Sequence, residues 1–538
     1  MSEQNGRGPG QLDVLVVGAG FSGLYLLHRL RGMGFSVRVL EKGSDVGGTW
    51  YWNRYPGARC DIESLDYSYS FDEDLQQEWS WPDRYSVQPD ILRYASHVTE
   101  RFDLRRDITF DTTVTAASWD QEAGRWTIET DTGEPITAAW FIMATGCLSA
   151  SRLPDILGIE SYEGDTYHTG LWPHEPVDFS GLNVGIIGTG SSAIQSIPII
   201  AQDAKHLTVF QRTPNFSVPA WNGPLDPDDE RERKENYAEV REFSRWSSGG
   251  FYSAAKDEAL IEQPDHAVQQ EIERRWAEGG FYVMDVYGDI MIDANANDAV
   301  AEFVRNNIRS RVNDPEIAEL LCPKSHPFGS KRLCVDTDYY ETYNRNNVTL
   351  VDLQTTPIEA ITETGVRTTH GDYTFDVIVF ATGFDAMTGA LTNVDIRGRD
   401  GQSLREKWQE GPRTYLGLTV AGFPNLFMIT GPGSPSVLSN MMTSIEQHVE
   451  WVTDCMAHVR DGQMARIEAT VEAENRWVDH VRETADETLY PQANSWYIGA
   501  NVPGKPHVFL PYVGGVGTYR KICEDIRVND YEGFEISR

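Results

Sequence analysis

Several features that mark secreted, metal-binding or membrane-spanning proteins are missing from this sequence of 538 residues. Its six cysteines form no C-x-x-C pair, and no Cys/His cluster has the spacing of a zinc site, so we expect reduced thiols and no metal. No apolar run reaches the ~18 residues that a transmembrane helix needs. Residues 1–10 lack the basic-then-apolar pattern of a signal peptide, which favours a cytoplasmic protein.

Positive charge is also scarce, because 46 Lys and Arg residues stand against 81 Asp and Glu residues and leave a net charge of −35. Nucleic acids and anionic membrane surfaces bind clustered positive charge, so neither is an expected partner. Hydrophobic residues make up 40% of the chain, as in ordinary globular proteins. At roughly 150 residues per domain, the length predicts about two to four domains.

The first motif lies near the N-terminus. Residues 14–17 form a short apolar run typical of a buried parallel strand, residues 18–23 read G-x-G-x-x-G, and a helical pattern follows. The next predicted strand, residues 37–40, ends at Glu41, whose carboxylate can accept hydrogen bonds from ribose hydroxyls. The alternative is a glycine turn that only packs a helix on a strand. We predict a site for FAD or NAD at the turn, with Gly18, Gly20, Phe21, Ser22 and Gly23.

A second unit of the same kind begins at residue 183. The strand 184–187 precedes a turn with alanine at its third small position, and the following strand, 207–210, leads into Arg212 and Thr213 instead of a carboxylate. A carboxylate would repel a 2′-phosphate, whereas arginine pairs with it. Arg212 as a solvated charge at a strand end is the alternative. We predict an NADP site, with the turn residues Gly188, Thr189, Gly190, Ser191 and Ser192.

The two units predict an α/β fold with two Rossmann-like dinucleotide-binding domains and a helical insertion. The strands 140–143 and 377–380 each end in Ala-Thr-Gly, where the chain can cross between domains. Residues from about 224 to 314 are acidic and read as helices. We expect a first domain from residues 1–146 and 384–538, a second domain from residues 147–223 and 336–383, and an insertion at 224–335.

Two longer motifs identify a family. Residues 47–61 (GGTWYWNRYPGARCD) and 162–173 (YEGDTYHTGLWP) resemble the two fingerprints of type I Baeyer–Villiger monooxygenases, class B flavoprotein monooxygenases. The departure is Tyr162 where phenylalanine is usual. Flavin disulfide reductases share the architecture but need a cysteine pair where Trp50 and Tyr55 stand here. Further stretches carry the resemblance across nearly the whole chain: residues 327–332, 411–417, 431–436 and 495–505.

The resemblance implies the reaction. NADPH reduces FAD, O2 forms a C4a-peroxyflavin, and attack on a ketone yields an ester or lactone, with sulfoxidation as a side activity. It also implies that Arg332 is the active-site arginine, that Asp61 orients it, and that Lys331 shares the 2′-phosphate with Arg212. The alternative for Arg332 is a structural ion pair.

Further roles follow from the same resemblance. Trp496 matches a tryptophan on a mobile loop over NADP, although a core aromatic is the alternative. His168 belongs to the linker fingerprint with Gly164 and Trp172, and we favour a hinge or a hydrogen bond over proton transfer. Gly48, Trp50 and Tyr55 are expected at the flavin. The expected substrate pocket is apolar and consists of Cys147, Pro435, Ser436, Val437, Leu438 and Met441.

Several alternatives stay open at this point. Aryl-alkyl, cyclic and steroid-like ketones are all compatible with the expected pocket. A flavin monooxygenase that oxygenates nitrogen or sulfur would share both nucleotide folds, although its linker fingerprint lacks the ending seen at Trp172 and Pro173. A non-catalytic flavin or NADP redox sensor would have no reason to contain Arg332 and Asp61. We expect a monomer or a weak oligomer.

Overall fold

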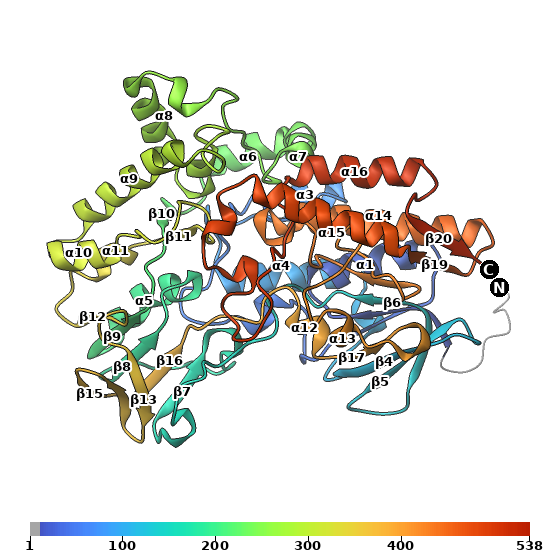
Figure 1. The fold of residues 1–538 in the computed structure, drawn as a ribbon, viewed down its shortest axis with the longest axis horizontal. Coiled ribbons are helices and arrows are strands. Elements are labelled where there is room, and N and C mark those ends of the chain that lie inside the picture. The colour runs from blue at the N-terminus through green and yellow to red at the C-terminus, as the bar shows by residue number, and fades with distance from the viewer. Residues whose placement is uncertain (1–10) are drawn as a thin grey trace.

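The computed structural model describes residues 11–538, so the prediction that no signal peptide is present falls outside the described residues. Two separate sheets organise the chain (Figure 1). The first lies at the lower right of the view, below the C-terminal helices α14 (Met441–Asp461), α15 (Val471–Asp486) and α16 (Val516–Val528). The second lies at the lower left, below the helices α8 to α10.

The first sheet has the strand order β17-β4-β5-β6-β1-β2-β3, with β18 beside β6. Its centre is parallel, because β1 pairs in parallel with β2 and with β6. Val14, Leu15 and Val16 of β1 are fully buried, which explains the continuous apolar run. The strands are β1 (Gln11–Val17), β2 (Val37–Leu40), β3 (Ile108–Thr109), β4 (Val114–Asp120), β5 (Arg125–Thr130), β6 (Ile136–Met143), β17 (Asp395–Arg397) and β18 (Leu426–Met428).

Helices cover this sheet. The helix α1 (Phe21–Gly32) follows β1 and packs in one hydrophobic core with α14, which comes from the far end of the chain. Residues near both ends of the sequence therefore build one layered unit. Further elements complete it: α2 (Thr49–Trp52), α3 (Glu73–Glu78), α4 (Gln88–Arg101), α12 (Gly389–Thr392), α13 (Leu404–Lys407), β19 (Arg466–Ala469) and β20 (Phe534–Ser537).

The second sheet has the order β12-β9-β8-β16-β7, and all its neighbouring strands are parallel. The helix α5 (Ser191–Asp203) connects β8 to β9, and the antiparallel sheet of β13, β14 and β15 lies between β12 and β16 along the chain. The strands of the second sheet are β7 (Asp165–His168), β8 (Asn183–Ile187), β9 (His206–Gln211), β12 (Val348–Asp352) and β16 (Val377–Phe380). Those of the antiparallel sheet are β13 (Ile358–Thr362), β14 (Gly365–Thr368) and β15 (Gly371–Thr374).

The predicted insertion is helical. It lies between β10 (Ser217–Pro219) and β11 (Cys334–Asp336), which pair with each other in a separate two-stranded sheet. Val300 and Ile308 of the insertion share a hydrophobic core with Val184 of β8. Its helices are α6 (Pro227–Glu235), α7 (Tyr237–Trp246), α8 (Asp265–Glu278), α9 (Ala294–Arg311) and α10 (Pro315–Leu321), and α11 (Tyr339–Thr342) follows it.

The domain boundaries at 146, 223, 335 and 383 stay predictions, although the two sheets recruit strands from the ranges expected. Over residues 11–538, we find no helix whose length and apolar character would let it cross a membrane.

Candidate active site

The glycine turn after β1 forms a cradle. Gly18 has φ +104°, and a Cβ there would lie 2.6 Å from the carbonyl oxygen of Ala144, so no larger residue fits. Gly20 is the N-cap of α1 and offers no side chain to the N–H groups of the first turn, in which Phe21 and Ser22 are buried. Gly48 of the first fingerprint lies against Gly20. These free donors fit the pyrophosphate of a dinucleotide.

Glu41 is already held in position at the end of β2. Its Oε2 accepts a hydrogen bond from the Ala19 N–H at 2.7 Å, and its Oε1 accepts one from the Gly43 N–H at 2.7 Å. Burial raises the pKa of this carboxyl group, and the two N–H donors oppose that rise. Each carboxylate oxygen keeps a second lone pair, so Glu41 can also accept ribose hydroxyls.

The turn after β8 repeats the geometry. Gly188 has φ +115°, and a Cβ there would lie 2.4 Å from the carbonyl oxygen of Ala381. Thr189 Oγ1 donates to the carbonyl of Thr213 at 3.0 Å, which fixes the end of β9 to the turn. Nothing lies within 4 Å of a Cβ built at Gly190, the N-cap of α5. Hydroxyls in the first turn contact neighbouring side chains, Ser191 with Cys334 at 3.2 Å and Ser192 with Thr169 at 3.0 Å.

Two cations lie beside this second turn. Arg212 is exposed, and within residues 11–538 its guanidinium has no hydrogen-bond or ion-pair partner. Burial lowers the pKa of Lys331, and the like charge of Arg212 lowers it further. Two neighbouring cations without a carboxylate repel each other until an anion joins them, so this donor set fits a 2′-phosphate.

Arg332 and Asp61 lie within ion-pair distance of each other. Arg332 Nη2 lies 3.4 Å from Asp61 Oδ2, and Arg332 Nη1 donates to the carbonyl of Val437 at 2.6 Å. The guanidinium carbon lies 5.0 Å from the centre of the Phe281 ring, in a cation–π contact. Burial acts to lower the pKa of Arg332, but the charge of Asp61 and smaller contributions from Tyr497, Cys60 and Cys334 together outweigh it, and the pKa is raised. Arg332 is therefore a fixed, permanently charged cation.

An apolar cluster adjoins this cation through Val437. The cluster contains predicted pocket residues, and Trp496, the tryptophan predicted on a mobile loop, packs against it with its ring centre 4.4 Å from that of Tyr497. Pro435 and Ser436 are buried directly before Val437. The cluster consists of Cys147, Ala386, Met387, Val437, Tyr497 and Leu510, and Leu438, Met441 and Trp496 are among the half-buried residues packed against it.

The linker fingerprint forms a hydrogen-bonded joint. His168 Nδ1 accepts the Gly170 N–H at 3.0 Å, His168 Nε2 lies 3.5 Å from Thr382 Oγ1, and burial lowers the pKa of the imidazole. A Cβ at Gly164 would meet the Tyr162 hydroxyl at 2.4 Å. Trp172 is buried and contacts the rings of Tyr167 and Phe179. This geometry favours a structural role for His168 over proton transfer, and the role stays a prediction.

The two aromatic residues of the first fingerprint that we expect at the flavin make specific contacts. Trp50 is buried and donates its indole N–H to the Tyr67 hydroxyl at 3.2 Å. The Tyr55 hydroxyl donates to Gln195 Oε1 at 2.8 Å. Tyr55 therefore contacts a helix of the second nucleotide fold.

Sequence reasoning missed three of the groups around Arg332 and Asp61. Gln195 lies two residues beyond the fingerprint of the second turn, Phe281 lies in the insertion, and Val437 acts through its backbone carbonyl. A search for polar residues on the helix after the second turn would have found Gln195. No sequence signal marks the other two, because both contacts depend on the tertiary fold.

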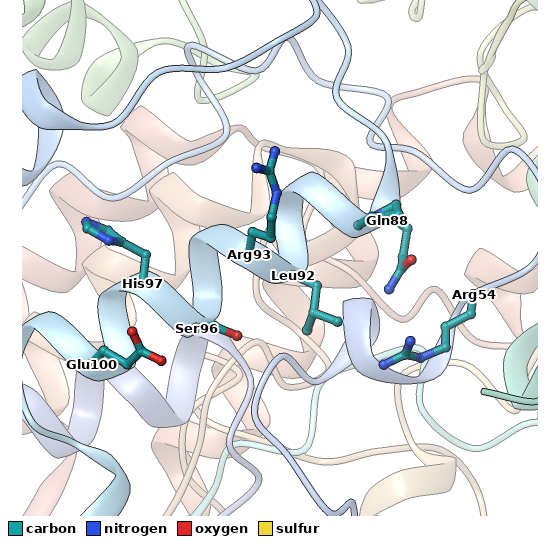
Figure 2. Close-up of a pocket in the computed structure, with 8 residues that line it drawn as sticks. Arg54, Gln88, Leu92, Arg93, Ser96, His97 and Glu100 are labelled. Atoms are coloured by element: carbon teal, nitrogen blue, oxygen red, sulfur yellow. The ribbon is translucent and has the colours of Figure 1, made fainter. Parts of the chain in front are cut away.

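A separate cavity of about 370 Å³ lies along α4 (Figure 2). It is lined by Arg54, Gln88, Pro89, Leu92, Arg93, Ser96, His97 and Glu100. None of the predicted site residues lines it. Among residues 11–538, no group of three or more His, Cys, Asp or Glu side chains is arranged to hold a metal ion.

The fold and these contacts define a protein with two dinucleotide-binding turns and a half-buried arginine that pairs with a buried aspartate. A family model for an NAD(P)-binding Rossmann-like domain matches residues 16–71. A Baeyer–Villiger monooxygenase from Pseudooceanicola batsensis is 42% identical over 96% of this chain and 95% of its own. A phenazine N-monooxygenase from Lysobacter antibioticus is 40% identical over 97% and 96%. The solved structure of an oxidised steroid monooxygenase bound to NADP superimposes with a TM-score of 0.94, at 51% identity over 98% of this chain and 99% of that chain.

The chain belongs to the Baeyer–Villiger monooxygenase family. Both the predicted fold class and the family resemblance are thereby confirmed.

Proposed function

We propose that this protein binds FAD in the first nucleotide fold and NADPH in the second, and that it oxidises ketones with O2 to esters or lactones. The observation that carries the proposal is the ion pair of the half-buried Arg332 with the buried Asp61, which adjoins an apolar cluster. The two free glycine cradles support the cofactor assignment. FAD bound at the first turn and reduced by NADPH bound at the second would activate O2, which would supply the transferred oxygen atom.

The residues of the chain meet an electrostatic requirement. Negative charge develops on the carbonyl oxygen of the ketone when its carbon is attacked, and a fixed cation in a water-poor site stabilises that charge. Arg332 remains protonated at any working pH, and Asp61 and the Val437 carbonyl hold it in one orientation. The surrounding apolar side chains exclude water, so the cation acts in a medium of low dielectric constant.

The pocket favours apolar ketones. Cys147, Val437, Leu438 and Met441 offer no charged group, and Cys147 is a small side chain that leaves room for a ring. We propose aryl-alkyl, cyclic or steroid-like ketones as substrates. The similarity to a solved steroid monooxygenase supports the inclusion of large, rigid ketones.

Replacement of Arg332 tests the reaction. Arg332→Ala should keep FAD, because the arginine lies outside both glycine turns, but should lower ester formation by on the order of 100- to 1000-fold. The measurement is ester yield per NADPH across a panel of ketones. Arg397→Ala on the surface strand β17 is the matched control and should behave as the unmodified protein. Ketone turnover by Arg332→Ala at the normal rate would contradict the proposal.

Oxygenation of nitrogen or sulfur is a second candidate. The Lysobacter relative, named for N-oxygenation, matches this chain as fully as the ketone-oxidising relatives do. Thioethers and heteroaromatic amines therefore belong in the substrate panel. Turnover of these compounds without any ester would favour this second function, and hydrogen peroxide without any organic product would favour a redox sensor.

We further propose a monomer or weak oligomer in the cytoplasm. The net charge of −35 disfavours self-association through charge repulsion, and the six free cysteines are compatible with a reducing compartment. Sedimentation velocity measures the oligomeric state, and fractionation of the source cells measures the location.

A further inference from the structure

We propose that Gln195 is a positioning residue that couples the nucleotide turn of the second fold to the Arg332–Asp61 pair. The inference rests on the proposed function and adds to it a link between the two nucleotide folds. Gln195 lies on α5, whereas its partners all lie in the first fingerprint, which follows the first nucleotide turn along the chain.

The fingerprint satisfies the side-chain amide of Gln195 completely. Gln195 Nε2 donates to Asp61 Oδ1 at 3.1 Å and to the carbonyl of Arg59 at 3.1 Å. Gln195 Oε1 accepts the Tyr55 hydroxyl at 2.8 Å and the Arg59 N–H at 3.3 Å. The amide is buried, so these four hydrogen bonds have no competition from bulk water.

The backbone of the fingerprint also lies directly on α5. Gly57 has φ +79°, and a Cβ there would lie 2.3 Å from the Gln195 carbonyl oxygen. The contact between the two folds is therefore rigid at this point. A movement of α5 must move the fingerprint or break the amide hydrogen bonds.

The position of Gln195 on α5 connects it to the nucleotide. Ser191 is the first residue of the helix, and Gln195 lies about one helical turn further along the same face. The first turn of α5 is where the pyrophosphate of NADP is expected to bind. A nucleotide that fixes this turn also fixes Gln195, and through Gln195 it fixes Asp61.

The two carboxylate oxygens of Asp61 contact different residues. Oδ1 accepts from Gln195, and Oδ2 faces Arg332. Burial raises the pKa of Asp61, whereas the charge of Arg332 and the hydrogen bond from Gln195 both lower it. Without the amide, Asp61 takes up a proton at a higher pH, and a neutral Asp61 no longer orients the guanidinium.

Other titratable groups also face Asp61. Among these groups, only Arg332 and Arg59 carry charge near neutral pH. The neutral phenols and thiols therefore do not replace the hydrogen bond that the Gln195 amide donates to Asp61. These groups are Arg332, Arg59, Tyr55, Cys60, Cys334 and Tyr85.

The decisive variant is Gln195→Met, which keeps the length of the side chain and removes both polar atoms. Gln202→Met, on the exposed side of the same helix, is the matched control. Gln195→Met should keep FAD and the rate of flavin reduction by NADPH without O2. Ester yield per NADPH should fall about 10-fold in favour of hydrogen peroxide, because a hydrogen bond to a charged group is lost. Ester yield falls on the acid side of its pH profile, and we call this part of the profile the acid limb. In Gln195→Met the acid limb should move up by about one pH unit.

A carboxylate in place of the amide sharpens the pH test. Gln195→Glu places a second acid against Asp61, and like charges raise each other's pKa. Its acid limb should therefore lie above that of Gln195→Met. Gln202→Met should keep the limb of the unmodified protein.

A second readout needs no ketone. NADP+ should slow hydrogen–deuterium exchange of the Arg59 N–H, which donates to Gln195 Oε1. The slowing should persist in Gln202→Met and disappear in Gln195→Met.

Several results would overturn the inference. They are an unchanged yield and acid limb in Gln195→Met, slowed flavin reduction with unchanged yield, and persistence of the NADP+ effect on Arg59. If Gln195→Met does not fold, Tyr55→Phe is the variant to test, because it removes only one of the hydrogen bonds donated to the Gln195 amide. An unchanged acid limb in Tyr55→Phe would contradict the inference. Absence of ester from the unmodified protein would instead contradict the proposed function.

Discussion

The two nucleotide folds of this protein share the same backbone turn but differ in how the side chain at the end of the second strand of each fold is held. In the first, Glu41 is buried and bonded to two backbone N–H groups at the end of β2. In the second, Arg212 is exposed at the corresponding end of β9, with no ion-pair partner in the part of the chain that the structure describes. The glycine turns themselves are nearly identical, because Gly18 and Gly188 each lie against a carbonyl of the adjacent strand exit.

This difference separates a resident cofactor from an exchanging one. A carboxylate that is already oriented needs no reorganisation when ribose binds, which favours a tightly held FAD. The repulsion between Arg212 and Lys331 is relieved only while a phosphate is present, and long-range attraction speeds the arrival of an anion. The second fold is thus suited to a nucleotide that binds and leaves in each turnover.

The largest expected effect comes from the two turn glycines. Gly18→Ala should lower FAD affinity on the order of 100-fold or more, because the added Cβ clashes with a carbonyl and the φ is strained. Gly188→Ala should do the same for NADPH while FAD remains bound. Flavin absorbance measures the FAD affinity of Gly18→Ala, and titration with NADPH measures the NADPH affinity of Gly188→Ala. Gly124→Ala, with a positive φ and open space, is the control. Loss of FAD in Gly188→Ala would show that damage to the second turn disrupts the first fold.

The sequence predicted these two turns because their residues are contiguous. The G-x-G-x-x-G spacing, Glu41 and Arg212 all follow from local patterns. The surroundings of Arg332 could not be predicted in the same way, since Phe281, Gln195 and the Val437 carbonyl come from three distant segments. A backbone carbonyl is present at every position, so the sequence does not reveal which one accepts a hydrogen bond.

A smaller effect should follow from the cations of the second fold. Neutralising Arg212 or Lys331 removes a charge-assisted hydrogen bond to the 2′-phosphate, so each change should lower the preference for NADPH over NADH by about 10-fold. The ratio of the two kcat/KM values measures it. FAD content should not change in either variant. If the preference persists in Arg212→Ala and in Lys331→Ala, the assignment of the second fold to NADP is wrong.

The smallest expected effect appears only in acid. Burial lowers the pKa of His448, on α14, to about 3, and that of His326, in the insertion, to about 4. Below pH ~6.5 these two histidines take up protons in the unfolded chain but not in the folded protein. The free energy of unfolding therefore decreases as the pH is lowered, by about 2 kcal/mol for each residue near pH 5.

His448→Gln keeps an acceptor for the Thr430 N–H, which His448 Nδ1 accepts at 3.1 Å, and cannot be protonated. Its unfolding midpoint should therefore decrease less between neutral pH and pH 5 than that of the unmodified protein. An equal decrease in both proteins would show that His448 does not limit acid stability.

The contact between Arg332 and the Val437 carbonyl has a consequence for how such enzymes diversify. Val437 holds the guanidinium through its backbone and faces the apolar cluster through its side chain. A mutation at this position changes the shape available to a ketone but leaves the carbonyl in place. The range of accepted ketones can therefore drift over evolutionary time while the cation that the chemistry needs stays where it is.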